Sequence, residues 1–176
     1  MIQTLISSKT RIKLLLKFFL NSSTTAYLRG LEEEFGESTN SIRLELNRFE
    51  NAGFLESYSE SNKKVFKVNV KHPLFKDINS IVLKLVGLNY VIDYVLQHMG
   101  DLKLVYLVGN LSKGKDSDVI DLVLVGDINE AFLIELIVKT EKKINKRINY
   151  IHYKEIDFNL KNITTVGASP LLLWSK

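Results

Sequence analysis

A polar segment with two glycines lies between two apolar runs in the second half of the chain, and its residue types could bind an anion. Residues 104–108 and 119–125 are the apolar runs, and each predicts a buried strand. Glycine lets a backbone approach a ligand closely, while amide, hydroxyl and ammonium groups can donate hydrogen bonds to an anion. The residues of this candidate pocket are Gly109, Asn110, Ser112, Lys113, Gly114, Asp118 and Asp121, and Lys115 could also hold an anion.

Two carboxylates at the end of this segment could add metal chemistry, but their spacing argues against it. Asp118 and Asp121 are three residues apart. Because side chains alternate between the faces of a strand, a regular strand would point the two carboxylates to opposite faces. A bulge would restore a shared face, and Asp116 with Asp118 offers a second pair, which lies in the loop. A two-metal site therefore requires an irregular strand or a rigid loop.

The stretch LVYLVGNLSKGKDSDVIDLVLVGD, residues 104–127, resembles the signature of the polymerase-β-like nucleotidyltransferases, including small MNT-type antitoxin relatives. The resemblance implies that Gly109 and Gly114 are loop glycines, that Asp121 is the second of two Mg²⁺-binding carboxylates, and that a nucleoside triphosphate is the substrate. Asn110 replaces the expected serine, Val119 replaces the first carboxylate, and the third strand lacks an acid.

We therefore expect a vestigial nucleotide or anion pocket with no catalytic residue, no metal and no cofactor. Loss of the metal carboxylates would remove the largest electrostatic contribution to phosphoryl transfer. The alternative is an active, antitoxin-like enzyme that uses Mg²⁺ and a nucleoside triphosphate to modify a protein or small-molecule hydroxyl. A loop retained only for the fold is a third interpretation.

The rest of the second half predicts a small α/β domain over residues 101–176. Residues 130–146 have the period of an amphipathic helix, and residues 147–153 alternate as a third strand. An apolar segment at 170–174 follows. Strands separated by a helix in this way predict a mixed sheet with helical cover.

The first half predicts three helices over residues 1–72. Residues 9–19 place apolar side chains at helical spacing. The segment 21–36 offers serine and threonine N-cap candidates, followed by a short helix with Ala26, Leu28, Leu31 and Phe35 on its apolar face, which ends at Gly36. A third helix starts with Ser38 or Thr39 as its N-cap and ends at Gly53.

A β-hairpin follows the third helix, with strands expected at 54–59 and 65–70 around a polar tip at 61–64. Three helices and a hairpin are the element order of a winged helix-turn-helix, in which the third helix enters the major groove. Polar side chains that could contact bases or phosphates there are Thr39, Asn40, Ser41, Arg43, Asn47 and Arg48, and Asn62, Lys63 and Lys64 from the wing.

The segment SIRLELNRFENAGFL, residues 41–55, resembles the recognition helix and turn of bacterial ArsR- and MarR-type regulators. The whole chain also resembles bacterial proteins in which such a domain is fused to a nucleotidyltransferase-like one. The resemblance implies a sequence-specific transcriptional regulator that binds double-stranded DNA. A winged helix used for protein contact, and a pure interaction module, are the alternatives.

Residues 73–100 should connect the halves as one long helix or two abutting ones, with Gly87 as the break. By analogy with dimeric winged-helix regulators, we expect this region to form a homodimer. The second domain would then serve dimerisation or sensing of a small anionic or nucleotide ligand.

The composition is consistent with this interpretation. The net charge of +4 weakly favours a nucleic-acid partner, and the absence of cysteine excludes disulfides and thiolate metal sites. Because lysines interrupt the N-terminal apolar run and no apolar run is long enough to span a bilayer, we expect a cytoplasmic protein without a membrane segment.

Overall fold

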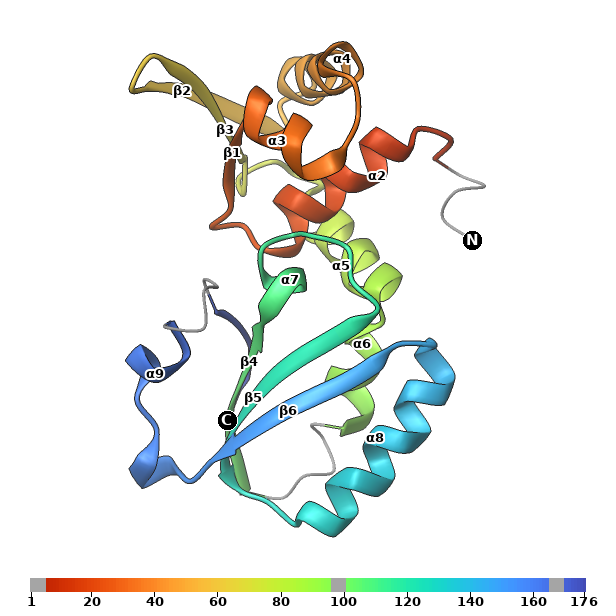
Figure 1. Cartoon of the computed structure of the whole chain (residues 1–176), viewed down its shortest axis with the longest axis vertical. Coiled ribbons are helices and arrows are strands. Elements are labelled where there is room, and N and C mark those ends of the chain that lie inside the picture. The colour runs from red at the N-terminus through yellow and green to blue at the C-terminus, as the bar shows by residue number, and fades with distance from the viewer. Residues whose placement is uncertain (1–5, 96–100, 165–169) are drawn as a thin grey trace. The chain divides into compact units, whose positions relative to one another are not determined.

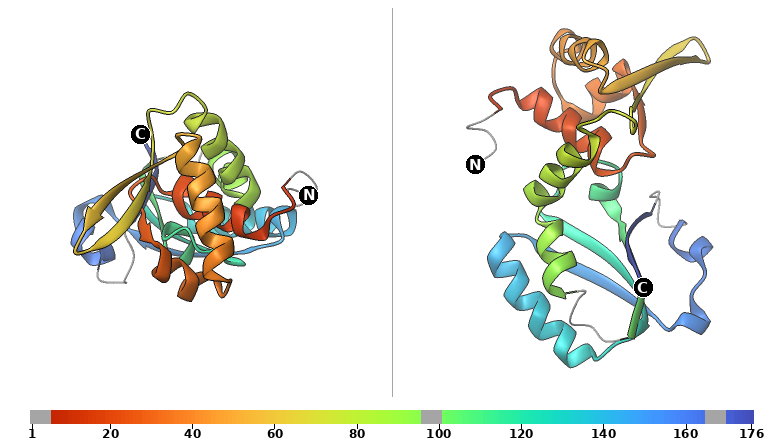
Figure 2. Two further views of the ribbon diagram at one scale, coloured as in Figure 1. Left: turned by 90° about the horizontal axis from the view of Figure 1, so that it is seen from above. Right: turned by 180° about the vertical axis from the view of Figure 1, so that it is seen from behind.

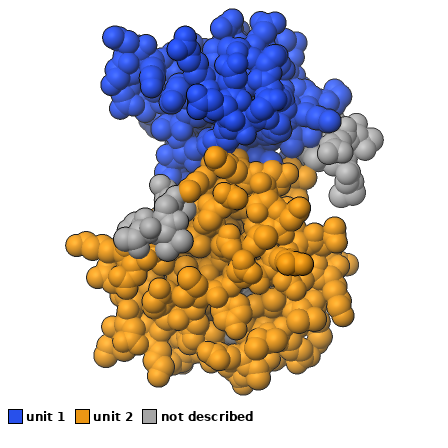
Figure 3. Space-filling view, in the orientation of Figure 1, with its two compact units in different colours: residues 1–82 blue, residues 83–176 orange. Residues whose placement is uncertain are grey.

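The computed structural model describes residues 6–95, 101–164 and 170–176 as a mixed α/β chain with two sheets. Residues 1–82 form one compact unit and residues 83–176 a second (Figure 3). We call them unit 1 and unit 2. Within the described residues, no helix is long and apolar enough to cross a membrane.

Unit 1 begins with three helical segments and a short strand. Helix α2 (Lys9–Leu15) continues as the π-helical turn η1 (Leu16–Leu20), and strand β1 (Thr25–Tyr27) precedes helix α3 (Leu28–Phe35). Helix α4 (Thr39–Asn51) then starts at Ser38, one of the two predicted caps, whose hydroxyl accepts a hydrogen bond from the Ser41 backbone N–H.

The hairpin of unit 1 consists of β2 (Leu55–Glu60) and β3 (Lys63–Val68), and it projects away from the helices (Figures 1 and 2). A two-residue turn joins the strands, in which Ser61 and Asn62 have φ of 47° and 61°. Two left-handed residues close a tight hairpin whose twist matches its strands. The predicted strand limits and four-residue tip were therefore wrong, because Lys63 and Lys64 belong to β3.

Strand β1 corrects the prediction that Ala26 lies on the apolar face of the second helix. Ala26 pairs with Phe66 in an antiparallel ladder, so that β1 completes a sheet of order β1-β3-β2. Residues 25–27 could satisfy helical periodicity locally, but their backbone groups are bound by a strand about forty residues further along the chain. Only the part from Leu28 onwards is helical.

The core of unit 1 lies where the helices meet. Fully buried side chains come from α2, η1, α3 and α4: Leu14, Phe18, Leu31, Ile42 and Leu46. Phe19 packs edge-on against Phe54 and is stacked with Phe75, at ring-centroid distances of 6.2 and 5.9 Å.

Helix α5 (Phe75–Val86) ends at Gly87, which has φ of 84°. A Cβ at residue 87 would lie 3.0 Å from the Ile144 Cβ, so the break needs glycine for its conformation and for its space. Helix α6 (Leu88–Tyr90) and the π-helical turn η2 (Val91–Val95) follow. Residues 96–100 of the predicted connecting region lie outside the described residues.

Unit 2 contains a four-stranded sheet of order β6-β5-β4-β7. Its strands are β4 (Asp101–Val108), β5 (Val119–Asp127), β6 (Arg147–Tyr153) and β7 (Leu171–Ser175). Strand β5 pairs parallel with β6 and antiparallel with β4, which in turn pairs antiparallel with β7. The sheet is therefore mixed, as predicted.

Helices lie on both sides of this sheet. Helix α8 (Glu130–Ile144) and α9 (Leu160–Thr164) are on opposite sides of the strands, with the 3₁₀ turn η4 (Glu155–Asp157) near α9 (Figure 1). Val123 and Val125 pack with Ile163 of α9, so alternation directs Ile120 and Leu122 to the α8 side. The segment after β4 is not an open loop, because Gly109–Ser112 forms the short helix α7.

Candidate functional sites

Helix α4 presents a polar stripe on the side opposite its core contacts. Ile42 and Leu46 are buried, whereas Asn40, Arg43 and Asn47 are exposed at positions i, i+3 and i+7. In the described part of the chain, none of these three side chains has a hydrogen-bond or ion-pair partner. The stripe is free to contact another molecule.

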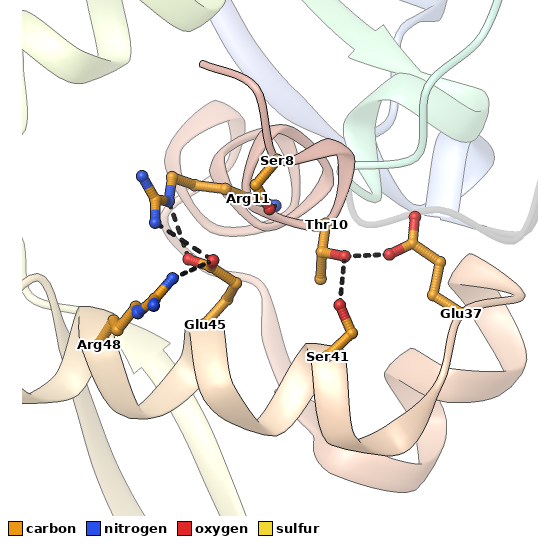
Figure 4. Close-up of polar contacts among 7 residues, drawn as sticks. All are labelled: Ser8, Thr10, Arg11, Glu37, Ser41, Glu45 and Arg48. Carbon is orange, nitrogen blue, oxygen red and sulfur yellow. Dashed lines mark hydrogen bonds and ion pairs between the residues drawn. The ribbon is translucent and has the colours of Figure 1, made fainter.

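Thr39 and Ser41 are placed differently from this stripe. Thr39 is half-buried in the first turn of α4. The Ser41 hydroxyl lies 3.0 Å from the Thr10 hydroxyl of α2, and Thr10 also donates to the Glu37 carboxylate (Figure 4). The structure therefore does not bring Ser41 together with the exposed stripe, because its hydroxyl joins α4 to α2.

Arg48 is held in an ion-pair cluster around Glu45. The Glu45 carboxylate accepts hydrogen bonds from Arg11 Nε at 2.8 Å, Arg11 Nη2 at 3.2 Å and Arg48 Nη1 at 2.8 Å (Figure 4). Burial raises the pKa of Glu45, but the hydrogen bonds and charges of Arg11 and Arg48 outweigh burial and lower the pKa below its usual value. Arg48 thus reaches outward from a fixed position.

Sequence reasoning missed this role of Glu45. A single acid between Ile42 and Leu46 on an otherwise apolar face was a usable signal, since a carboxylate is seldom buried unless it is paired. Its partner on the same helix was predictable from the i, i+3 spacing to Arg48, but Arg11 lies 34 residues away.

A second carboxylate, Glu50, connects the end of α4 to both strands of the hairpin. Its Oε1 accepts from the Ser57 hydroxyl at 2.5 Å, and its Oε2 accepts from Lys64 Nζ at 2.7 Å. The hydrogen bonds from Lys64 and Ser57 lower the pKa of Glu50, against a smaller opposing effect of burial. Lys64, predicted as a phosphate contact, is therefore already paired.

Lys63 lies against β1 and Asn62 lies at the tip. The Lys63 Nζ is 4.3 Å from the centroid of the Tyr27 ring, which is a cation–π contact. This contact leaves the ammonium donors of Lys63 available, because a ring face accepts no conventional hydrogen bond. Asn62 is exposed.

A groove of about 670 Å³ separates α4 from the hairpin within unit 1. Five predicted site residues line it: Arg43, Asn47, Asn62, Lys63 and Lys64. Tyr27 and Arg29 also line it and were not predicted. Among the described residues that line the groove, Arg29, Arg43, Lys63 and Lys64 are cationic and none is acidic. The groove therefore has a positive electrostatic character.

The candidate pocket of unit 2 centres on Asp121. Its Oδ1 accepts a hydrogen bond from Asn149 Nδ2 at 3.1 Å, across the parallel pairing of β5 with β6. Its other carboxylate oxygen lies against Gly109, where φ is 72°. Gly109, Asp121 and Asn149 thus meet at the end of β4, and the side chain that faces Asp121 from β6 is an amide.

Asp118 does not join this group. It precedes β5 and lines a different hollow, of about 670 Å³, together with Glu141, Lys142 and Arg147. Its backbone carbonyl accepts from the Arg147 N–H at 2.8 Å. Asp118 and Asp121 therefore have separate surroundings. Nowhere in residues 6–95, 101–164 and 170–176 do three acids or histidines form a group that could hold a metal ion.

The remaining residues of the predicted pocket shape the turn after β4. The fully buried Ser112 donates its hydroxyl hydrogen to the Gly109 carbonyl at 2.9 Å. The Asn110 carbonyl accepts from the Lys113 and Lys115 backbone N–H groups, and Gly114 has φ of 71°. Ser112 closes a helical turn, while the Asn110 side chain is exposed and could reach a ligand.

Comparisons with known proteins give one remote likeness. No protein-family model and no curated protein sequence matches the chain. A solved structure described as a predicted DNA-binding transcriptional regulator from E. coli is 19% identical, covers 48% of this chain and 81% of its own, and superposes with a TM-score of 0.36.

Proposed function

We propose that the chain is a DNA-binding transcriptional regulator whose unit 1 is a winged helix-turn-helix. Helix α4 would enter the major groove, and the β2–β3 hairpin would be the wing. The observation that carries this proposal is the groove between them, which has four cationic and no acidic lining residues in the described chain. Duplex DNA carries one negative charge per about 1.7 Å of axis, so a positive groove of this kind suits it.

The exposed stripe of α4 supplies the residues that would read sequence. Arg43 can donate two hydrogen bonds to guanine, and Asn40 or Asn47 can form a donor–acceptor pair with adenine. Arg48, Asn62 and Lys63 would contact phosphates, since Arg48 is fixed by Glu45 and the other two lie on the hairpin. Thr39 would lie at the edge of this surface.

Selection of bound duplexes from a randomised library, followed by fluorescence anisotropy on the selected sequence, tests the proposal. We expect Arg43→Ala with Asn47→Ala to weaken binding by about 1–3 kcal/mol for each residue that reads a base. Lys76→Ala is the control, because Lys76 is exposed on α5 and does not line the groove. Equal binding by the double variant and the wild type would refute the assignment.

For unit 2 we propose a nucleotidyltransferase-like domain without catalytic activity, which serves dimerisation or the sensing of a small anionic ligand or nucleotide. The support is the pairing of Asp121 with an amide at Asn149 rather than with a carboxylate. Two-metal phosphoryl transfer needs carboxylates that hold both ions. The rival function is an active Mg²⁺-dependent nucleotidyltransferase, and the position of Asp121 directly beside Gly109 favours it.

We also propose that the chain forms a homodimer through the region of α5. Leu74 and Ile81 are about half exposed, at 50% and 49%, and they lie seven residues apart at helical spacing. Light scattering after size-exclusion chromatography should give twice the monomer mass for the wild type. The Ile81→Glu variant should have a lower average mass, because a charge on this apolar face would weaken the dimer. The exposed neighbour Ser80 provides the control variant Ser80→Glu. A monomeric wild type would refute the proposal.

A further inference from the structure

Arg29 is a cation of the groove that the winged-helix assignment has left without a role. It lies in the first turn of α3, directly after β1, and is exposed. It lines the groove together with Arg43 of α4 and Lys63 of β3. The groove thus has lining residues from β1 and α3 as well as from α4 and the hairpin, and only α4 and the hairpin were expected to contact DNA.

The four cations of the groove differ in what already holds them. Lys64 donates to Glu50 at 2.7 Å, and Lys63 lies 4.3 Å from the Tyr27 ring centroid. Arg29 and Arg43 have no hydrogen-bond or ion-pair partner in the described part of the chain. Two guanidinium groups are therefore open to an anion, and guanidinium is the side chain best suited to hold a phosphate with two hydrogen bonds.

The position of Arg29 determines which part of a duplex it can meet. Arg43 belongs to the α4 stripe and would follow that helix toward base edges. Arg29 belongs to α3 and lines the groove beside the helix, so it faces what lies between α4 and the hairpin. When α4 is in a major groove, the part of DNA that separates it from the wing is a sugar–phosphate strand.

We propose that the groove between α4 and the hairpin holds one sugar–phosphate strand of a DNA duplex, with Arg29 as a phosphate-binding residue that sets affinity without reading sequence. This inference rests on the proposed function of unit 1. It divides the two open guanidinium groups by role: Arg43 discriminates between sequences, and Arg29 binds every duplex equally.

The salt dependence of binding separates these roles. Each phosphate contact contributes about −0.9 to the slope of log K against log salt concentration. Using the full chain with a selected duplex and a scrambled one, we expect Arg29→Gln to weaken both complexes by the same factor, about 3–10-fold. The slope should become shallower by about one. Arg29→Lys keeps the charge and should retain most of the slope.

Lys76→Gln is the matched control, since it removes the same charge from an exposed site outside the groove and should leave the slope unchanged. Thermal unfolding of each variant shows whether the fold is intact, and exposed Arg29 should tolerate the substitution. If the wild type binds no duplex, the proposed function fails. If the wild type binds but Arg29→Gln keeps the affinity and slope, or changes discrimination between the two duplexes, this inference fails. Stronger binding to single-stranded RNA than to the duplex would also overturn it.

Discussion

The carboxylate of Asp121 occupies the space that a side chain at residue 109 would need. A Cβ added to Gly109 would collide with Oδ2 and lie 3.1 Å from the Asp121 Cγ, and Gly109 has φ of 72°. Glycine is required there both for the backbone conformation and for the close approach of the carboxylate. The glycine at the end of β4 is thus explained within the fold, before any ligand is considered.

Gly109→Ala should lower the free energy of unfolding by about 2–4 kcal/mol, because it adds a steric clash to the strain of a left-handed residue. Chemical denaturation measures this change. Gly36→Ala is the matched control, since Gly36 has φ of 62° but nothing within 4 Å of the added Cβ. It should cost only about 1 kcal/mol. The double variant Gly109→Ala with Asp121→Ala should recover part of the loss, and a lack of any recovery would contradict the clash.

Protonation of Glu45 in acid should lower the free energy of unfolding. Its pKa is lowered in the folded state, so its contribution is complete above the usual carboxyl value of 4.5 and is lost as pH falls through the folded pKa. We expect the free energy of unfolding to drop below pH 4.5, and Glu45→Gln to reduce that drop while costing about 1–3 kcal/mol at pH 7. Part of the drop should persist in the variant, because the pKa values of Glu37 and Glu50 are lowered too.

The control for Glu45 is Glu33→Gln on the exposed side of α3. It should leave the stability at pH 7 nearly unchanged. Equal acid sensitivity of wild type and Glu45→Gln would show that the Arg11–Glu45–Arg48 cluster does not contribute to stability.

Glu50→Gln should strengthen duplex binding, because it frees Lys64 to contact a phosphate. The salt slope should become steeper by about one. Glu56→Gln is closely matched, since it removes the same charge and releases Lys67, which does not line the groove. Anisotropy titrations over a range of salt concentrations distinguish the two variants. If Glu50→Gln and Glu56→Gln gave the same salt slope, Lys64 would not contact DNA.

Asn149→Asp should make thermal stability depend on divalent cations, a dependence that we do not expect of the wild type. Two carboxylates would then face each other where the Asn149 amide now lies 3.1 Å from Asp121. Their repulsion should destabilise the fold by about 1–2 kcal/mol at pH 7, and Mg²⁺ that binds between them should restore stability by mass action. Thermal unfolding with and without Mg²⁺ tests this, with Asn149→Ala as the control that no ion should rescue.

Catalysis is tested directly by incubation with each nucleoside triphosphate and Mg²⁺. We expect no pyrophosphate release from the wild type, because Asp118 lines a different hollow from Asp121. Release that disappears in Asp121→Ala would instead establish the nucleotidyltransferase. Binding of a nucleotide without release would support the sensing role of unit 2.

Much of the local structure could be predicted from the sequence, because it depends on neighbours along the chain. Helix α4 is specified by the Ser38 cap, by Ile42 and Leu46 at helical spacing, and by the glycine that follows. The break at Gly87 and strand β6 were predictable for the same reason. Strand β1 was not, since its three residues become a strand only by pairing with β3.

The tertiary structure decided which polar groups meet. The sequence by itself determined that α4 carries Arg43, Asn47 and Arg48, and that Asp118 and Asp121 are out of phase. Only the fold paired Arg48 with the buried Glu45, Lys64 with Glu50 and Asp121 with Asn149, and only the fold brought Arg29 to the groove. Helix and strand patterns are encoded within one or two turns of chain, whereas the partner of a charge depends on packing between segments that lie far apart in the sequence.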